Sequence, residues 1–288
     1  MELRDLKAAL AYAARATTIY DVHAPVAYRF VAEVIEDRRH FHALDWVADL
    51  RAAYARDRTA LTLDDHGAGP RAGGTTRKTI AEIAASSGTP ERFGGYLLRA
   101  ADLLRPRRVL ELGTNLGLGT AYLAAGLPPG GRLVTIDADR QVLAKAERSV
   151  GELYPDADLR FVHGTFDGAL AGCLRQLDGR VDLAFVDGHH EEHATVRYFE
   201  TVLPSTGPSS VLIFDDIHWS AGMERAWRRI RRHPATRVTI DLFRWGVVFL
   251  DPAVRSPQHY TIVPRAWKPW HLGFFSSRTS GAHAAPSG

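Results

Sequence analysis

A chain of 288 residues with 45% hydrophobic and 24% charged side chains can bury the core of one α/β domain with an extension. The net charge of +3 and the pI near 9.1 are too mild to indicate nucleic acid binding, and we expect none. The single cysteine, Cys173, excludes an internal disulfide and fits a cytoplasmic location. We see neither a secretion signal nor an apolar run of the ~18 residues that span a membrane.

The first 90 residues predict two segments that precede the main domain. Residues 1–60 have the pattern of a helical extension, with helices over 2–17, 26–35 and 43–55. Residues 61–90 are expected to form a linker or lid, because 62–76 is polar and rich in glycine, and a short helix follows over 77–86. The part most suited to a lid is 64–69, although a plain linker explains it equally well.

From residue 91 to residue 265 the chain reads as one domain in which helices and strands alternate. A helix over 91–104 comes first. Strands are expected at 109–112, 133–136, 159–163, 181–186 and 211–214, with helices at 120–125, 141–153, 168–177, 191–203 and 223–232. This alternation favours a parallel sheet covered on both faces.

The end of the chain predicts a different strand arrangement. The strands at 237–243 and 247–250 are joined by a short turn and must therefore be antiparallel, and 259–263 is a candidate edge strand. Residues 266–288 form a C-terminal tail, of which 276–288 has the composition of a disordered segment.

Strand, glycine turn, helix, strand and acid follow one another over residues 108–139, which is the order of a nucleotide-binding unit. Asp137, which ends the second strand, can accept hydrogen bonds from both hydroxyls of a ribose. The order G-x-x-x-G-x-G differs from the G-x-G-x-x-G of dinucleotide sites and disfavours a nicotinamide-dependent oxidoreductase. Because Glu111 precedes the turn and no basic residue lies in it, a cationic ligand suits it better than a phosphate. An arbitrary glycine-rich turn is the alternative.

The segment ELGTNLGLGT resembles motif I of the class I S-adenosylmethionine (SAM)-dependent methyltransferases, and VTIDAD resembles their ribose-binding motif. The resemblance implies a Rossmann-like α/β fold with a seven-stranded, mostly parallel sheet whose last strand is antiparallel. It also implies that SAM is the cofactor, with Glu111 and the turn at its methionine part and Asp137 at its ribose. The residues implied to bind SAM are Glu111, Gly113, Thr114, Asn115, Gly117, Thr120, Asp137, Thr165, Phe166 and Asp187.

The adenine side of the implied cofactor site follows the third strand. By the same resemblance Phe166 stacks on the adenine ring, and Asp167 accepts a hydrogen bond from its amino group. From the residues alone, an ordinary helix start with Asp167 as its cap is an equal alternative.

Acids also end two later strands. Asp187 follows one strand, and Asp215 and Asp216 follow the next. Such carboxylates repel one another unless they are protonated or bridged by a cation, and three oxygen ligands suit Mg²⁺. A metal ion there could hold a substrate hydroxyl and lower its pKa. The alternative is that Asp187 and Asp215 cap the helices that follow them.

This layout resembles the catechol O-methyltransferase group and related cation-dependent sugar O-methyltransferases. The resemblance implies that Asp187, Asp215 and Asp216 bind the metal ion and that His190 is the general base. A histidine is partly neutral at pH 7 and can take a hydroxyl proton. The alternative for His190 is a solvent-facing place at a helix start, and two other histidines are nearby candidates: His189 and His218.

Residues 210–250 also resemble a group of uncharacterised bacterial SAM-dependent methyltransferases that carry a similar helical extension. Three aromatic residues are candidates for a substrate wall, although buried aromatic rings more often belong to a core; they are Tyr96, Trp219 and Trp245. These patterns predict an O-methyltransferase for a small hydroxylated acceptor, with assistance from a divalent metal ion. A metal-independent N- or O-methyltransferase and a non-catalytic SAM-binding protein are the alternatives, and a homodimer is one option for its assembly.

Overall fold

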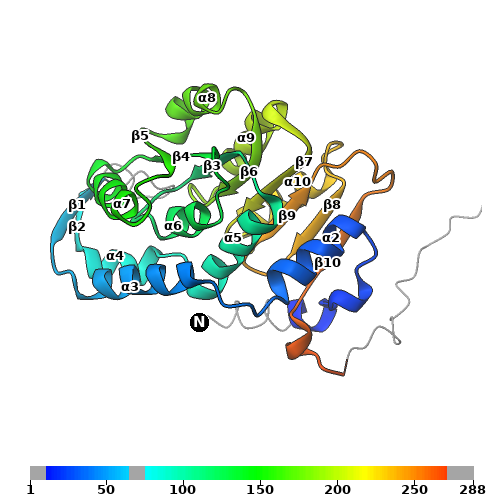
Figure 1. The fold of residues 1–288 in the computed structure, drawn as a ribbon. Coiled ribbons are helices and arrows are strands. Elements are labelled where there is room, and N and C mark those ends of the chain that lie inside the picture. Colours follow the sequence, from blue (N-terminus) through cyan, green and yellow to red (C-terminus); the bar gives the residue numbers. More distant parts are fainter. Residues whose placement is uncertain (1–10, 65–74, 271–288) are drawn as a thin grey trace, which may run out of the picture.

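The computed structural model describes residues 11–64 and 75–270, and an eight-stranded sheet forms its centre (Figure 1). The strand order is β10-β8-β9-β7-β6-β3-β4-β5. β9 is antiparallel to both of its neighbours, β7 and β8, whereas the other pairs are parallel. The strands are β3 (Arg108–Leu112), β4 (Arg132–Asp137), β5 (Asp158–His163), β6 (Val181–Val186), β7 (Thr206–Phe214), β8 (Val238–Asp241), β9 (Gly246–Phe249) and β10 (Gln258–Thr261).

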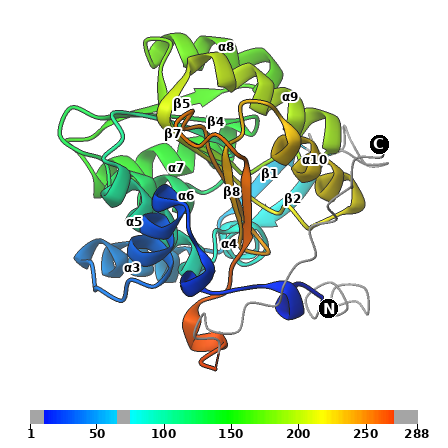
Figure 2. The same ribbon diagram turned by 90° about the vertical axis from the view of Figure 1, so that its right-hand side faces the viewer.

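The predicted α/β fold is therefore confirmed, and the candidate edge strand is β10. Helices connect the strands and lie on both faces of the sheet; Figure 2 shows α9 and α10 on one side and α3 and α5 on the other. They are α5 (Glu91–Leu104), α6 (Leu118–Ala125), α7 (Arg140–Leu153), α8 (Phe166–Gln176), α9 (Glu192–Val202) and α10 (Ala221–Arg232).

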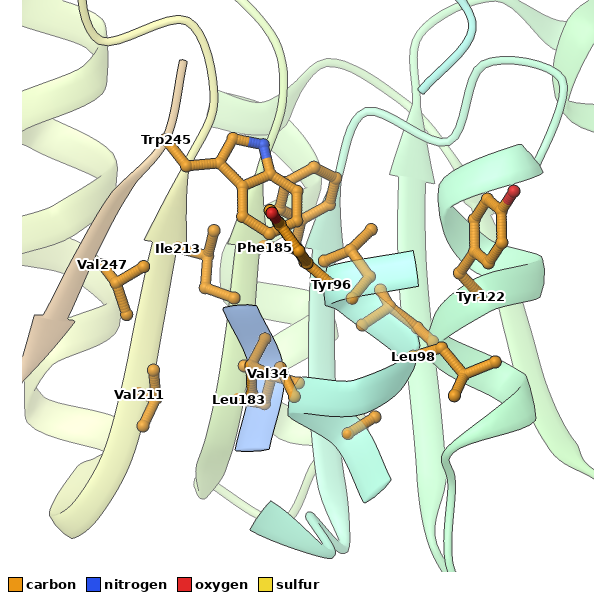
Figure 3. Packing of buried hydrophobic residues seen from close by; sticks show 14 of the residues in the cluster. Val34, Tyr96, Leu98, Tyr122, Leu183, Phe185, Val211, Ile213, Trp245 and Val247 are labelled. Carbon is orange, nitrogen blue, oxygen red and sulfur yellow. The ribbon is translucent and has the colours of Figure 1, made fainter. Parts of the chain in front are cut away.

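Alternate residues of the central strands supply two hydrophobic cores. Leu183, Phe185 and Ile213 face α5, α6 and α7, whereas Ala184 and Leu212 face α8, α9 and α10. Successive side chains of a strand point to opposite faces, so a strand covered on both sides carries mostly apolar residues. This explains why most residues of the central strands are apolar, with the buried Glu111 as an exception. Figure 3 shows part of the first core, including Leu98 and Tyr122.

The helices before the sheet pack into that same first core. Phe30 lies 5.5 Å from Phe249 of β9, measured between ring centroids, and Val31, Val34 and Val47 are completely buried. The elements concerned are η1 (Ile19–Asp21), α2 (Pro25–Phe30), the π-helical η2 (Val31–Ile35) and α3 (His42–Arg56). Since they share the core of the sheet, the predicted helical extension folds against the main domain.

A short hairpin replaces part of the predicted linker. β1 (Ala60–Asp64) and β2 (Thr75–Thr79) form an antiparallel pair, and α4 (Ile80–Ser87) begins three residues later than expected. Thr79 fixes that start, because its hydroxyl accepts a hydrogen bond from the Glu82 N–H while the Glu82 carboxylate accepts one from the Thr79 N–H. The centre of the proposed lid, the start of the first helix and the tail over 276–288 lie outside the described residues.

Segments from both ends of the chain complete one edge of the sheet. Thr17 pairs with the segment after β10, where its N–H donates to the Thr261 carbonyl at 2.8 Å and its own carbonyl accepts from Val263. The Tyr12 hydroxyl donates to the carbonyls of Ile262 and Asp241 at 2.6 and 3.1 Å. This terminal clasp covers the edge beyond β10.

Candidate functional site

The glycine turn brings two strand ends into contact. Gly113 has a φ of +104°, and a Cβ there would lie 1.8 Å from the carbonyl oxygen of Asp187, so only glycine fits. Gly117 has a φ of +80° and begins α6. Asn115, also left-handed at +49°, donates its side-chain amide to the Ser87 carbonyl. The turn is therefore held in one shape above the ends of β3 and β4.

Asp137 lies under this turn at the end of β4. Its carboxylate accepts hydrogen bonds from the backbone N–H groups of Asn115 and Asp139, at 2.8 and 2.9 Å. Each carboxylate oxygen can accept more than one hydrogen bond. The orientation of Asp137 is thus fixed by the backbone.

Glu111 is completely buried beside the turn. One carboxylate oxygen accepts hydrogen bonds from the hydroxyls of Thr120 and Thr135, at 2.5 and 2.7 Å, and Thr114 joins them through Thr135 at 2.6 Å. The other oxygen, Oε1, is buried with no hydrogen-bond partner among the described residues. Burial, opposed by the two hydroxyls, raises the pKa of Glu111 to about 7.

The residues predicted to lie at the adenine, Thr165, Phe166 and Asp167, have contacts that differ in part from those expected. Phe166 is half-buried against Gly188, where a Cβ would approach its ring to 2.8 Å. Thr165, rather than Asp167, caps α8 by accepting from the Gly168 N–H. Asp167 forms a two-oxygen ion pair with Arg197 on α9. The capping role considered for Asp167 is therefore filled by Thr165, and its contact with the adenine amino group stays a prediction.

The three later acids meet at the ends of β6 and β7. His190 lies between two of them, with Nε2 3.9 Å from Oδ1 of Asp187 and 3.8 Å from Oδ2 of Asp216. Asp215 is 1% exposed and makes a bidentate ion pair with Arg244, at 2.7 and 2.6 Å. Arg244 also lies 3.5 Å from Asp216.

Burial and mutual repulsion govern the charge of these acids. Burial, followed by the negative charges of Asp215 and Asp216, raises the pKa of Asp187 well above its usual value. Burial and Asp215 also raise the pKa of Asp216. Arg244 opposes both shifts, because its guanidinium favours the ionised carboxylates.

The predicted Mg²⁺ site does not fit these residues as they are arranged. In the part of the chain that the structure describes, no group of three or more acidic, histidine or cysteine side chains is placed to hold a metal ion. The physical reason is that both oxygens of Asp215 already bind Arg244, which supplies the positive charge that the sequence argument assigned to a metal. We therefore derive no chemical step through Mg²⁺.

Arg244 is the residue that sequence reasoning missed. It lies in the turn between β8 and β9, and Gly246 of β9 pairs with Phe214, the last residue of β7. Because β9 is antiparallel to β7, it begins at the edge where β7 ends, and this places Arg244 beside Asp215. The short turn between the last two predicted strands was the feature of the sequence that could have indicated the position of Arg244.

The other two histidines have their own partners. Nδ1 of His189 lies 3.2 Å from the Tyr198 hydroxyl. Nε2 of His218 lies 2.9 Å from Asp241, and its ring stacks on Phe243 at 5.6 Å. Of the three candidates, His190 is the one that faces both Asp187 and Asp216.

Comparison with known proteins identifies a segment of this chain that is similar to methyltransferases. Residues 110–217 match a family model described as a methyltransferase domain, and that segment holds the glycine turn and all of the predicted acids. This segment is similar to class I methyltransferases of the catechol O-methyltransferase-like type. The match ends before Arg244. The arginine that pairs with Asp215 in the acid cluster (Asp187, Asp215 and Asp216) therefore lies outside the segment that the family model covers.

Similar curated proteins are named as O-methyltransferases. A catechol O-methyltransferase of Niastella koreensis is 26% identical over 124 residues, which are 43% of this chain and 55% of that protein. The mouse catechol O-methyltransferase domain-containing protein 1 is 32% identical over 127 residues, which are 43% and 47% of the two chains. The alignments thus span about half the length of these relatives.

Solved methyltransferases share the fold. The SAM complex of the O-methyltransferase TomG from Streptomyces achromogenes has a TM-score of 0.54 at 20% identity, covering 74% of this chain and 91% of that one. The SAH-bound methyltransferase PaMTH1 from Podospora anserina also has a TM-score of 0.54, at 13% identity, covering 80% and 97%. Within the described ranges, no helix of this chain is long and apolar enough to cross a membrane.

Proposed function

We propose that this protein transfers the methyl group of SAM to a hydroxyl of a small molecule, and that residues 91–265 form the catalytic domain. One observation carries the proposal: Glu111, Asp137 and His190 lie on the same edge of the sheet, at the carboxyl ends of neighbouring strands. Ligands of open α/β sheets bind outside this edge. The O-methyltransferase names of the relatives support the reaction class.

In this proposal the glycine turn and Asp137 hold the cofactor. Asp137 accepts from the ribose hydroxyls, Thr114, Asn115, Gly117 and Thr120 shape the surrounding wall, and Phe166 borders the adenine. Oε1 of Glu111, which has no protein partner among the described residues, accepts from the amino group of the methionine part. The contacts of Asp137 and Glu111 use acceptors that the fold already orients.

His190 takes the proton from the acceptor hydroxyl. The new O–CH₃ bond forms as the S–CH₃ bond breaks, the bonding electrons return to sulfur, and S-adenosylhomocysteine (SAH) leaves. The proton goes to Nε2 of His190, and Asp216 lies 3.8 Å away, where its negative charge stabilises the imidazolium. Assistance by Mg²⁺ is not part of this proposal. We also propose a cytoplasmic location, because the only cysteine, Cys173, is buried and unpaired.

Calorimetric titration with SAH and transfer of a labelled methyl group to a panel of hydroxylated small molecules test the proposal. We expect His190→Gln to lower kcat by about 10²–10⁴ while SAH affinity is retained. His193→Gln, an exposed histidine one turn further on, is the matched control and should keep full activity. A folded protein that binds neither SAH nor SAM would refute the function.

A further inference from the structure

The acid cluster already contains a cation that is held by the backbone. The Arg244 carbonyl accepts a hydrogen bond from the Ile217 N–H at 3.1 Å, so the β8–β9 turn is tied to the loop that follows β7. The side chain then reaches back to Asp215 with two short hydrogen bonds. A bidentate pair with a carboxylate that is 1% exposed fixes the plane of the guanidinium as well as its position.

The Arg244 side chain remains partly exposed. Nε and Nη2 bind Asp215, whereas no hydrogen bond from Nη1 is found in residues 11–64 and 75–270, and the side chain is 31% exposed. The guanidinium lies 5.9 Å from the ring of Phe93. Arg244 can thus donate to a ligand oxygen without releasing Asp215, because guanidinium has five N–H donors.

Aromatic groups border this cation. Trp245, next in sequence, is completely buried, with its ring centroid 5.0 Å from that of Phe93 and 5.6 Å from that of Phe185. Its Nε1 has no hydrogen-bond partner among the residues described. Figure 3 shows the indole beyond Ile213, toward the end of the strands where the acids lie. A second donor without a protein partner among the described residues therefore belongs to the residue that follows Arg244 in sequence.

We propose that Arg244 takes the place of a divalent cation at the acceptor site and binds the reacting oxygen as its negative charge develops. This inference rests on the proposed function. The methyl group still passes from sulfur to oxygen and the proton to His190, while the guanidinium N–H groups stabilise the oxyanion.

The class of acceptor follows from the kind of cation. A divalent ion can lower the pKa of a weakly acidic hydroxyl and can bind two neighbouring oxygens at once. A guanidinium spreads one positive charge over three nitrogens and stabilises an oxyanion less. The acceptor must therefore bring an already acidic hydroxyl, such as a single phenol with a pKa near ~10, and needs no second oxygen beside it.

Metal binding by the whole protein tests the inference without depending on turnover. The dialysed protein is titrated with Mn²⁺ by electron paramagnetic resonance and with SAH by calorimetry. We expect SAH to bind and Mn²⁺ to show no saturable binding. Arg244→Gln should create one Mn²⁺ site, because the three acids lose their protein cation, and adding Asp215→Asn should remove it. Arg255→Gln, at an exposed arginine, is the control and should bind no Mn²⁺.

Two results would overturn the inference. One is a single Mn²⁺ site in the unmodified protein that Asp215→Asn abolishes; the other is a folded Arg244→Gln variant without any Mn²⁺ site. If Arg244→Gln does not fold, the Mn²⁺ titration of the unmodified protein tests the inference alone. Arg244→Lys, which keeps the positive charge, should also bind no Mn²⁺. Loss of SAH binding in the unmodified protein would refute the proposed function, whereas a native Mn²⁺ site beside normal SAH binding would refute this inference alone.

Discussion

Several residues around the site have a backbone conformation that L-amino acids seldom adopt. Asn115, His189 and Asp216 all have φ near +50°, and each follows the end of a different strand. Left-handed conformations of this kind cost free energy and persist only where surrounding contacts enforce them. Here each of them turns the chain sharply at the sheet edge, so that side chains from β3, β6 and β7 converge on one place.

Glu111 gives a prediction about pH. Its pKa is raised to about 7 from a usual value near 4.5, so the folded state binds this proton more tightly than the unfolded state. The resulting stability is complete below about pH 4.5 and is lost as pH rises through about 7. Without cofactor, the melting temperature of the unmodified protein should therefore fall, relative to Glu111→Gln, between about pH 5 and pH 8. Parallel melting curves for the two proteins would contradict this.

Asp137 gives a prediction about cofactor affinity. Asp137→Ala removes an acceptor for two ribose hydroxyls, and each hydrogen bond to a charged group is worth ~1.5–3 kcal/mol. SAH affinity measured by calorimetry should fall at least ~10-fold. Asp137→Asn keeps one acceptor oxygen, so its SAH affinity should fall less. Asp156→Ala, at an exposed aspartate, should leave SAH affinity unchanged. Equal affinities for all four proteins would exclude Asp137 from the ribose site.

At the scale of helices and strands, the N-terminal helices support the cofactor turn. The Tyr54 hydroxyl of α3 is buried and donates to the Leu116 carbonyl at 2.9 Å, and Asn115 of the same turn donates to Ser87 at the end of α4. A region outside the matched family segment thus holds the shape of the glycine turn. The helical extension therefore helps to shape the turn that we propose binds the cofactor.

Tyr54→Phe should weaken SAH binding although it cannot touch the cofactor directly. The loss of one buried hydrogen bond costs about 0.5–1.5 kcal/mol, and we expect both SAH affinity and melting temperature to decrease. Tyr28→Phe changes a tyrosine that is 50% exposed and serves as the control. If Tyr54→Phe lowers the melting temperature but leaves SAH affinity intact, α3 stabilises the fold without shaping the turn.

The elements that could be predicted from the sequence are those with local signals. Apolar runs ending in acids identified β3, β4, β6 and β7 and placed their acids at one edge. The hairpin of β1 and β2 could not be predicted, because each arm is five residues long and ten residues separate the two arms. Arg244 and the Asp167–Arg197 pair also could not be predicted, since each depends on how distant elements pack rather than on spacing.

At the scale of the whole molecule, the terminal clasp should contribute to stability and not to cofactor binding. Tyr12→Phe removes a donor from two carbonyls and should cost about 1–3 kcal/mol, which lowers the melting temperature by several degrees. SAH affinity should be unchanged, because Tyr12 contacts the far edge of the sheet rather than β3 or β4. Tyr20→Phe, at an exposed tyrosine, is the comparison, and equal melting temperatures for the two variants would contradict the prediction.

The terminal clasp can form only late in the synthesis of the chain. Thr17 and its partner Thr261 are 244 residues apart, and synthesis proceeds at about 5–20 residues per second. The segment that holds Thr17 must therefore wait roughly 12–50 s before its partner has been made. Throughout that interval the helices and inner strands can fold, but this edge of the sheet cannot close. The segment around Thr17 consequently lacks its native partner until Thr261 has been made.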